Sequence, residues 1–309
     1  MSTEPRIAPW YRRVPWHVVG FMAPAVIIYS VFMIYPLFDS LRLSLFDDAG
    51  VFVGLANYDV LLTNQNWAPR FFGALTNNFV FFVVHMIVQN GLGLLLAAIL
   101  TTKVLRGRTF YRTAIFTPTV LSVVIIGFAW QLILSPLWGI AEGFLGFFGL
   151  EDLYLPWLGL SGSALIVLSL ISVWQFVGIP MLLFSAALLA ISDEVIEAAR
   201  VDGASSLRTF RSIQLPLIAP TIGIVAVLTF VGNFNAFDLI YTVQGGLAGP
   251  DFSTDVLGTF FFRTFFGHQL QLGNPTMGAT VAGMMFLIIL IGVLLYLFGV
   301  QRRLLKAQG

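Results

Sequence analysis

Six long apolar runs dominate the sequence, and they are uncharged apart from Asp238 in the fifth run. The runs cover residues 17–38, 77–100, 113–134, 163–190, 217–243 and 277–300. About 20 apolar residues in an α-helix cross the hydrocarbon core of a bilayer, where only helices and closed barrels satisfy every backbone hydrogen bond. We therefore expect an all-α fold, a polytopic membrane protein with six transmembrane helices.

The composition excludes a soluble globular protein. Of the 309 residues, 58% are hydrophobic and only 10% are charged, whereas about a quarter of the residues of a soluble domain are charged. The absence of cysteine excludes disulfides and thiolate metal sites. The first run is too long for a signal-peptide core and no small-residue cleavage pattern follows it, so we expect it to be retained as a span.

Basic residues are distributed unevenly between the segments that join the runs. With the N-terminus inside, thirteen of the sixteen lysines and arginines are cytoplasmic, and only Arg42, Arg70 and Arg263 lie outside. By the positive-inside rule we expect one transmembrane domain, residues 1–309, with cytoplasmic tails 1–16 and 301–309. We expect residues 39–75 to form an outer loop with one short helix, and the interrupted stretch 137–157 to form an interfacial helix.

The segment 191–216, between the fourth and fifth runs, is polar but patterned to fold. Ser192 can cap a helix whose first turns carry Asp193, Glu194 and Glu197, where the helix dipole favours negative charge. Gly203 is expected to stop this helix. A second helix is expected over 205–213, with Pro216 and Pro220 preventing its continuation. The pattern predicts a compact helix-turn-helix loop on the cytoplasmic side.

The loop contains Glu197-Ala198-Ala199, then Asp202-Gly203 and Leu215-Pro216. This pattern resembles the cytoplasmic "EAA" loop of ATP-binding-cassette (ABC) importer permeases. The segments YPLFDSLRLSLFD and GGLAGPDFSTDVLGTFFFRTFF also resemble outer segments of carbohydrate permeases, although the GGP of the latter is interrupted here by an insertion. The resemblance implies an ATPase-coupling role for Glu197, Ala198, Ala199, Asp202, Gly203 and Pro216.

The resemblance also implies the location of the chain, the bacterial plasma (inner) membrane, and its partners. In that family two permease chains surround one path, a homodimeric ATPase subunit binds ATP and Mg, and an extracytoplasmic solute-binding protein delivers a sugar. The chain itself is then expected to bind no cofactor and no nucleic acid, and to be surrounded by membrane lipid.

The residues needed for enzymatic chemistry are missing from the sequence. It contains no H-E-x-x-H, no Walker-type phosphate loop and no C-x-x-C, and His17, His85 and His268 lie in different segments. Ser161 and Ser163 in GLSGSA have the wrong spacing for a nucleophile elbow. We therefore expect no catalytic site and no metal site, and we assign ATP hydrolysis to a separate subunit.

A few polar side chains lie deep in the runs and are candidates for a solute path. They are His85, Gln89, Ser172, Trp174, Gln175 and Asn233. Such groups also form hydrogen bonds between helices, which is the interpretation we favour for His85 and Gln89. Trp174 is equally suited to stacking on a sugar and to packing. Asp238 is expected at the outer end of its span, as a solvated end or a gate.

The segment FVGNFNAF, residues 230–237, resembles the fifth-span segment that lines the sugar site of maltose-type permeases. The resemblance places Asn233 on a sugar-binding position and Thr119 and Ser172 on solute-contacting positions. Ala236 and Phe176 differ from some relatives, which leaves the substrate open. The complete set of expected solute-path residues is Thr119, Ser172, Trp174, Gln175, Asn233 and Asn235.

Three alternatives remain at this point. The solute could be a glycerol-3-phosphate-like ester, although the spans contain no basic cluster that would hold a phosphate tightly. The chain could be an ion-coupled secondary transporter, although no carboxylate is buried within a run. A scaffold protein with the same bundle is a more distant alternative.

Overall fold

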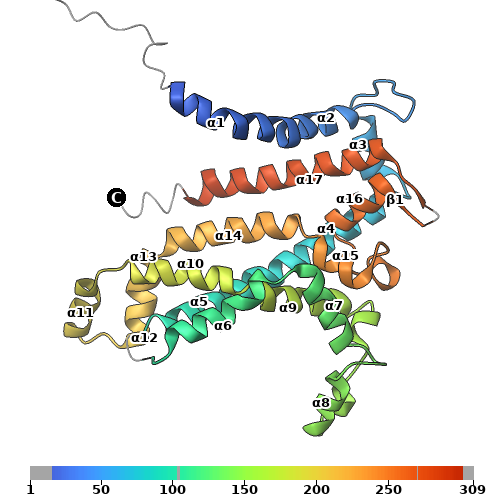
Figure 1. Ribbon diagram of the computed structural model, residues 1–309. Coiled ribbons are helices and arrows are strands. Elements are labelled where there is room, and N and C mark those ends of the chain that lie inside the picture. The colour runs from blue at the N-terminus through green and yellow to red at the C-terminus, as the bar shows by residue number, and fades with distance from the viewer. Residues whose placement is uncertain (1–15, 103–104, 270, 302–309) are drawn as a thin grey trace, which may run out of the picture.

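The structure, a computed structural model, describes residues 16–102, 105–269 and 271–301. It is almost entirely helical, which confirms the expected class (Figure 1). Its one regular sheet in the described residues is a hairpin of β1 (Gly267–His268) and β2 (Gln271–Leu272). The predicted tails lie outside the described residues except for their inner ends, Trp16 and Gln301.

Four helical segments of the described chain are long and apolar enough to cross a membrane without a sharp bend. They are Trp16–Leu43, Ala68–Leu100, Ala219–Gln244 and Pro275–Gly299. Three further helix pairs pass the same test but are bent by 72° to 95°, so the number of candidate spans is between four and seven. The expected six falls in this range and stays a prediction.

The first two spans are longer than predicted. The first consists of α1 (Trp16–Tyr29), the π-helical η2 (Ser30–Ile34) and α2 (Tyr35–Leu43), and it continues past residue 38 into the expected loop. An ion pair of 2.9 Å between Arg42 and Asp39, one helical turn apart, supports the extra turn. The loop holds the expected short helix, α3 (Ala56–Thr63).

The second span consists of α4 (Ala68–Val84), the π-helical η3 (His85–Gln89) and α5 (Asn90–Leu100), so the predicted start at residue 77 is wrong. Pro69 in the first turn explains the earlier start. The backbone N–H groups of a first turn have no acceptor within the helix, so proline, which lacks an N–H, is favoured there.

The predicted third span, 113–134, is formed by two helices and stays a prediction as a span. α6 (Arg108–Val120) and α7 (Val123–Ile133) meet at 95°, because Leu121 and Ser122 are extended. Pro118 in the last turn of α6 lacks the N–H that would continue the helix regularly. The following segment contains α8 (Ala141–Phe147), η4 (Glu151–Leu153) and η5 (Trp157–Gly159). The interfacial position of this segment stays a prediction.

The fourth predicted run forms α9 (Ala164–Phe176) and α10 (Gly178–Leu189), with one non-helical residue between them. A glycine is required at 178, because a Cβ there would lie 2.9 Å from the Cα of Phe116 on α6. This close approach holds the junction of the two helices against α6. Further along, α10 packs closely against α5.

The polar loop folds into α11 (Asp193–Val201), α12 (Ser206–Thr209), the π-helical η6 (Phe210–Gln214) and α13 (Leu215–Leu217). The predicted stop at Pro216 is wrong, because η6 continues without a break into α13, which contains this proline. The predicted stop at Pro220 agrees with the structure: α13 ends at Leu217, Ile218 is not helical, and Pro220 lies in the first turn of α14, where its missing N–H costs nothing. Ser192 is at the N-cap of α11 but makes no capping hydrogen bond.

The remaining chain forms α14 (Ala219–Phe234), α15 (Asp238–Gln244), η7 (Pro250–Phe252), α16 (Leu257–Phe266), α17 (Pro275–Leu295) and the π-helical η8 (Tyr296–Gln301). α16 lies between the predicted fifth and sixth spans, in the segment that resembles an outer segment of carbohydrate permeases. It packs against α17 and α4. Buried Phe71, Phe260 and Met277 form part of one core cluster that joins these helices.

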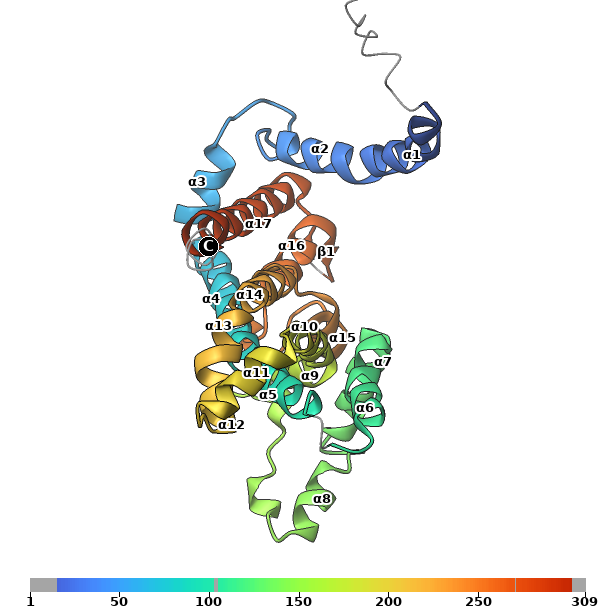
Figure 2. The ribbon, with the colours of Figure 1, turned by 90° about the vertical axis from the view of Figure 1, so that its left-hand side faces the viewer.

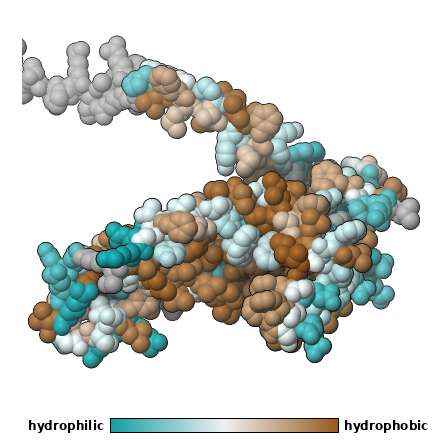
Figure 3. All heavy atoms as spheres, turned by 60° about the horizontal axis from the view of Figure 1, so that its bottom comes forward, coloured by the Kyte–Doolittle hydropathy of each residue, from teal (hydrophilic) through white to brown (hydrophobic). Residues whose placement is uncertain are grey.

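The N-terminal end of α1, the C-terminal end of α17 and the α11–α12 loop lie at one end of the molecule, and α3, β1 and α16 lie at the other (Figure 1). α1 lies apart from the helices that follow α2 (Figure 2), whereas α2 packs against α17, and none of the most apolar part of Trp16–Leu43 is buried within the chain. Hydrophilic residues gather at the two ends and hydrophobic ones between them (Figure 3). This arrangement agrees with a membrane-spanning bundle whose polar ends face water.

Candidate solute cavity and coupling loop

A cavity of about 350 Å³ lies between η3, α9, α10, α14 and α15. Its polar lining side chains are His85, Gln89, Ser172, Thr229, Asn233, Asn235 and Asp238. The rest of the lining is apolar, including Phe81 and Phe176. A largely apolar cavity with a few convergent polar groups is the usual form of a small-molecule site.

The π-helical turn η3 places two polar side chains on the cavity wall. His85 and Gln89 are its first and last residues, and both are buried. The Nδ1 atom of His85 lies 2.7 Å from the carbonyl oxygen of Phe81 and must donate to it. In the neutral ring Nε2 then accepts from the hydroxyl of Ser172, 2.9 Å away on α9. The favoured interhelical hydrogen bond is thus found for His85, on a wall of the cavity.

Gln89 and Asn233 line the cavity, but their side-chain oxygens are covered by protein. Asn233 donates through Nδ2 to the carbonyl of Thr229, at 2.7 Å, and its backbone carbonyl accepts from Asn78, at 2.8 Å. The side-chain oxygens of Gln89 and Asn233 accept no hydrogen bond from any described residue. The interhelical hydrogen bond favoured for Gln89 is therefore not found among the described residues.

Three of the six expected solute-path residues, Ser172, Asn233 and Asn235, line the cavity, and Thr119, Gln175 and Trp174 do not. Thr119 donates to the carbonyl of Gln175 at 2.8 Å, and the Gln175 amide donates to the carbonyl of Leu121 at 3.3 Å. These two bonds tie the break between α6 and α7 to α9. Their part in solute passage stays a prediction.

Trp174 lies outside the cavity, on the surface of the chain. Its side chain is 45% exposed and meets Trp130 of α7 edge to face, with ring centroids 5.6 Å apart. This contact accords with the packing interpretation, and the exposed part of the ring leaves stacking on a solute as a prediction.

Asp238 begins α15 and lines the cavity. It follows the non-helical residues that separate α15 from α14, and it is exposed. No described residue forms an ion pair or a hydrogen bond with its carboxylate. A carboxylate in the first turn of a helix interacts favourably with the helix dipole.

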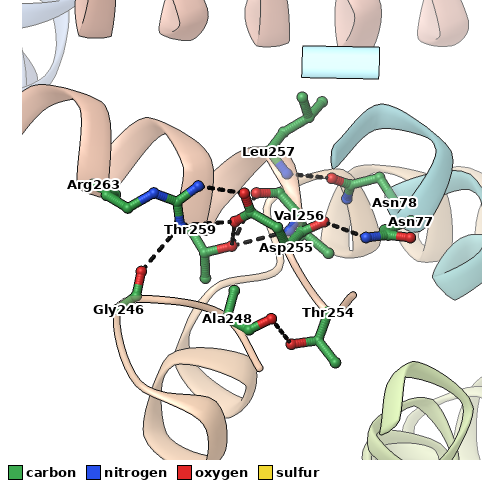
Figure 4. A network of polar contacts seen from close by, with 10 residues as sticks. All are labelled: Asn77, Asn78, Gly246, Ala248, Thr254, Asp255, Val256, Leu257, Thr259 and Arg263. Carbon is green, nitrogen blue, oxygen red and sulfur yellow. Dashed lines mark hydrogen bonds and ion pairs between the residues drawn. The ribbon is translucent and has the colours of Figure 1, made fainter. Parts of the chain in front are cut away.

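A buried ion pair that the sequence pattern did not predict joins Asp255 to Arg263 (Figure 4). Arg263 also donates to the carbonyl of Gly246 at 3.0 Å, and Thr259 donates to Asp255 at 2.7 Å. Asn77 of α4 donates to the backbone carbonyl of Asp255 at 2.8 Å. Burial raises the pKa of the Asp255 carboxyl, and the guanidinium of Arg263 opposes that change.

This network fastens the start of α16 to α4 and to the loop after α15. One signal for it is present in the sequence, an acidic and a basic residue eight positions apart in a segment otherwise rich in phenylalanine. Periodicity alone does not bring the two side chains together. Their pairing depends on the loop before α16.

The α11–α12 loop ends its first helix in a Schellman motif. Gly203 has φ +81°, its N–H donates to the carbonyl of Arg200 at 3.0 Å, and the N–H of Ala204 donates to that of Ala199 at 2.9 Å. Ser205 then caps α12 by accepting from the N–H of Arg208 at 3.3 Å. The predicted turn at Gly203 is therefore confirmed.

The coupling residues expected from the sequence are mostly exposed on this loop. Ala199 is buried, whereas the remaining members are exposed: Glu197, Ala198, Asp202, Gly203 and Pro216. Val201, at the end of α11, is 87% exposed although it is apolar. The loop thus has one anchoring face and one open face at the end of the molecule (Figure 1).

Comparison with known proteins agrees with this architecture. A profile of the family described as "Binding-protein-dependent transport system inner membrane component" matches residues 89–305. The chain is 34% identical over 267 residues to the probable ABC transporter permease protein YurN of Bacillus subtilis (strain 168), covering 84% of this chain and 89% of that protein. It is 32% identical over 246 residues to the lactose transport system permease protein LacF of Rhizobium radiobacter, covering 80% and 82%.

The fold is also similar to that of a solved protein. A chain in the crystal structure of a bacterial ABC transporter involved in the import of the acidic polysaccharide alginate superposes with a TM-score of 0.78, at 20% identity, over 93% of this chain and 96% of that one. The family profile covers more than half of the sequence, and both relatives exceed 30% identity over most of it. The chain therefore belongs to the inner-membrane permease components of binding-protein-dependent ABC transport systems.

Proposed function

We propose that this chain is the permease subunit of an ATP-driven importer for a carbohydrate. The observation that carries the proposal is the cavity in a permease chain, where amide and hydroxyl groups converge on an otherwise apolar wall. Hydroxyl groups of a sugar can bond the amides while its C–H faces contact apolar surface. The lactose permease among the relatives supports a carbohydrate as the solute.

The coupling part of the proposal rests on the exposed face of the α11–α12 loop. A separate homodimeric ATPase, which binds ATP and Mg, docks on α11 through Glu197, Ala198 and the exposed end of the helix. Ala199 is the buried member of the motif, and α11 packs against α12 of the same loop. Gly203 keeps the turn compact, so that movement of α11 is transmitted to the neighbouring helices.

Transport then follows by alternating access. Closure of the ATPase dimer on ATP moves the loop, and the bundle opens to the outside, where an extracytoplasmic binding protein releases the solute. A second permease completes the path, since this chain supplies one coupling loop for two ATPase copies. Ser172, Asn233 and Asn235 contact the solute in the cavity, and His85 orients the hydroxyl of Ser172.

Purification of the complex through this chain in mild detergent, followed by mass spectrometry, tests the proposal. We expect an ATPase, a second permease and ATP hydrolysis that the loaded binding protein stimulates. The ligand of the binding protein then identifies the sugar. The proposal fails if the chain purifies alone and reconstituted vesicles take up the solute under an ion gradient without ATP, which is the behaviour of a secondary transporter.

The same experiment addresses a glycerol-3-phosphate-like solute. No lysine or arginine lines the cavity, so no observation on this chain favours a phosphate ester over a neutral sugar. A phosphate ester bound to the copurified binding protein would replace the sugar in the proposal and leave the coupling part intact.

A further inference from the structure

The cavity has an uneven charge. Among its lining residues Asp238 is the only aspartate or glutamate, and no lysine or arginine is present. Asp238 is exposed, and no described residue pairs with its carboxylate. The cation on the neighbouring α16, Arg263, is 2% exposed and engaged by Asp255 and the carbonyl of Gly246. Nothing in the described chain therefore neutralises the charge of Asp238.

The polar groups of the cavity wall differ in whether a solute can reach them. The oxygens Oε1 of Gln89 and Oδ1 of Asn233 are buried acceptors without a donor from the described chain. Ser172 directs its hydroxyl hydrogen to His85 and presents lone pairs elsewhere. Both amide oxygens are covered by protein, whereas the exposed side chains of Asn235 and Asp238 line the cavity and can accept hydrogen bonds from a solute.

We propose that Asp238 makes the cavity select uncharged, hydroxyl-rich solutes and repel anionic ones, such as sugars that carry carboxylate or phosphate groups. The inference rests on the proposed function, because it names the solute class of the same cavity. A carboxylate at the cavity lowers the local concentration of anions and raises that of cations. The hydroxyls of a neutral carbohydrate can donate to the exposed side-chain oxygens of Asn235 and Asp238.

The alternative role of Asp238 is local, since an acidic first turn stabilises a helix. Asp238→Asn separates the two roles because the shapes are nearly identical and only the charge is lost. The test must therefore measure the electrostatic potential in the cavity, because a change in the stability of α15 would not distinguish the two roles.

A reporter thiol provides that reading. The chain has no cysteine. Gly232 lines the cavity, and a Cβ added there meets no atom within 4 Å, so Gly232→Cys fits without displacement. In the assembled complex, the thiol is treated with cationic (trimethylammonium-ethyl) or anionic (sulfonatoethyl) methanethiosulfonate. Each reagent forms a mixed disulfide and releases methanesulfinate. Mass spectrometry of this chain gives both rates, which are divided by the rates for a free thiol.

We expect the normalised cation-to-anion rate ratio to exceed one and to fall about 3- to 10-fold in Asp238→Asn, the range for one charge several ångströms away in a partly aqueous site. High salt should reduce the ratio in the Asp238 protein. Asp59→Asn is the matched control, because Asp59 is an exposed aspartate on α3 that does not line the cavity. It should leave the ratio unchanged.

The inference is overturned if Asp238→Asn leaves the normalised cation-to-anion rate ratio unchanged, or if neither reagent modifies the thiol. Stimulation of ATP hydrolysis by the binding protein is measured on the same preparations. If the binding protein still stimulates ATP hydrolysis but Asp238→Asn does not change the cation-to-anion rate ratio, only the charge selection is refuted. A charge-dependent ratio without any coupled ATPase refutes the proposed function and leaves the charge of the cavity established.

Discussion

Two serines on α9 show how a single hydroxyl is assigned to packing or to the cavity. Ser169 and Ser172 are both buried, one turn apart. Ser169 donates to the carbonyl of Leu165 at 2.7 Å, within its own helix. Ser172 instead bonds His85 across the bundle and lines the cavity. The same residue type therefore has a local role in one position and a role between helices in the other.

We predict that Ser172→Ala weakens solute transport and that Ser169→Ala does not. The loss of one hydrogen bond to the solute or to His85 costs about 1 kcal/mol, which corresponds to about a fivefold rise in the half-saturating solute concentration. The measurement is ATP-driven uptake in vesicles as a function of solute concentration. Equal effects of the two substitutions would remove Ser172 from the solute site.

At the scale of elements, the turn after α11 requires a left-handed residue. Gly203 has φ +81°, and Gly50 in the outer loop has φ +78°, and an added Cβ meets no atom within 4 Å at either position. Alanine therefore costs about 1–2 kcal/mol at both positions through the backbone alone. Comparison of the alanine variants at Gly203 and Gly50 therefore separates a loss of stability from a loss of coupling.

We predict that Gly203→Ala lowers the uptake driven by each hydrolysed ATP and that Gly50→Ala leaves this ratio unchanged. The strained turn weakens the Schellman motif and loosens α11 relative to α12. Uptake and ATP hydrolysis are measured together on complexes matched for assembly. If both variants lower the ratio equally, or neither does, the turn does not transmit movement.

The second feature at the scale of elements is the buried ion pair between Asp255 and Arg263, which holds α16 to the segment before it. The side chains of Asp255 and Arg263 are 4% and 2% exposed, whereas those of Asp39 and Arg42 are 42% and 64% exposed. Removal of one partner of a buried pair leaves an uncompensated charge and costs about 3–5 kcal/mol. An exposed pair contributes less than about 1 kcal/mol.

We predict that Asp255→Asn lowers the thermal unfolding midpoint of the detergent-solubilised protein by several degrees and that Asp39→Asn barely changes it. The double variant Asp255→Asn with Arg263→Met should recover part of the loss, because it removes the isolated buried cation. Thermal unfolding of the purified protein checks all three. A double variant less stable than Asp255→Asn would show that Arg263 stabilises α16 mainly through the carbonyl of Gly246.

At the scale of the whole molecule, local patterns predicted some features and three-dimensional contacts determined the rest. The turn at Gly203 and the helical class follow from local glycine chemistry and apolar run length, and both were predictable. The bend between α6 and α7 involves Thr119 and Gln175, which meet across helices. The burial of Arg263 depends on a partner in the preceding loop. The sequence contains these polar residues, but its local pattern does not show which of them pair.

Each end of the molecule has an exposed apolar side chain, but only one of the two lies beside the coupling motif. Val201 is 87% exposed on the coupling loop, and Leu55 is 71% exposed beside α3 at the opposite end (Figure 1). An exposed apolar side chain next to the coupling motif fits the docking of the ATPase there. A charge introduced at an apolar contact is costly, because the charge loses its water when the partner binds.

We predict that Val201→Asp removes most of the ATPase from the complex purified through this chain, and that Leu55→Asp retains it. Quantitative mass spectrometry of the ATPase-to-permease ratio measures the effect. Retention of the second permease in both variants is the control for folding. Full retention of the ATPase in Val201→Asp would mean that the ATPase contacts α11 through its other exposed residues, Glu197 and Ala198. Loss in both variants would mean that the ratio reports folding, because a docking surface confined to the coupling loop cannot respond to a residue at the far end.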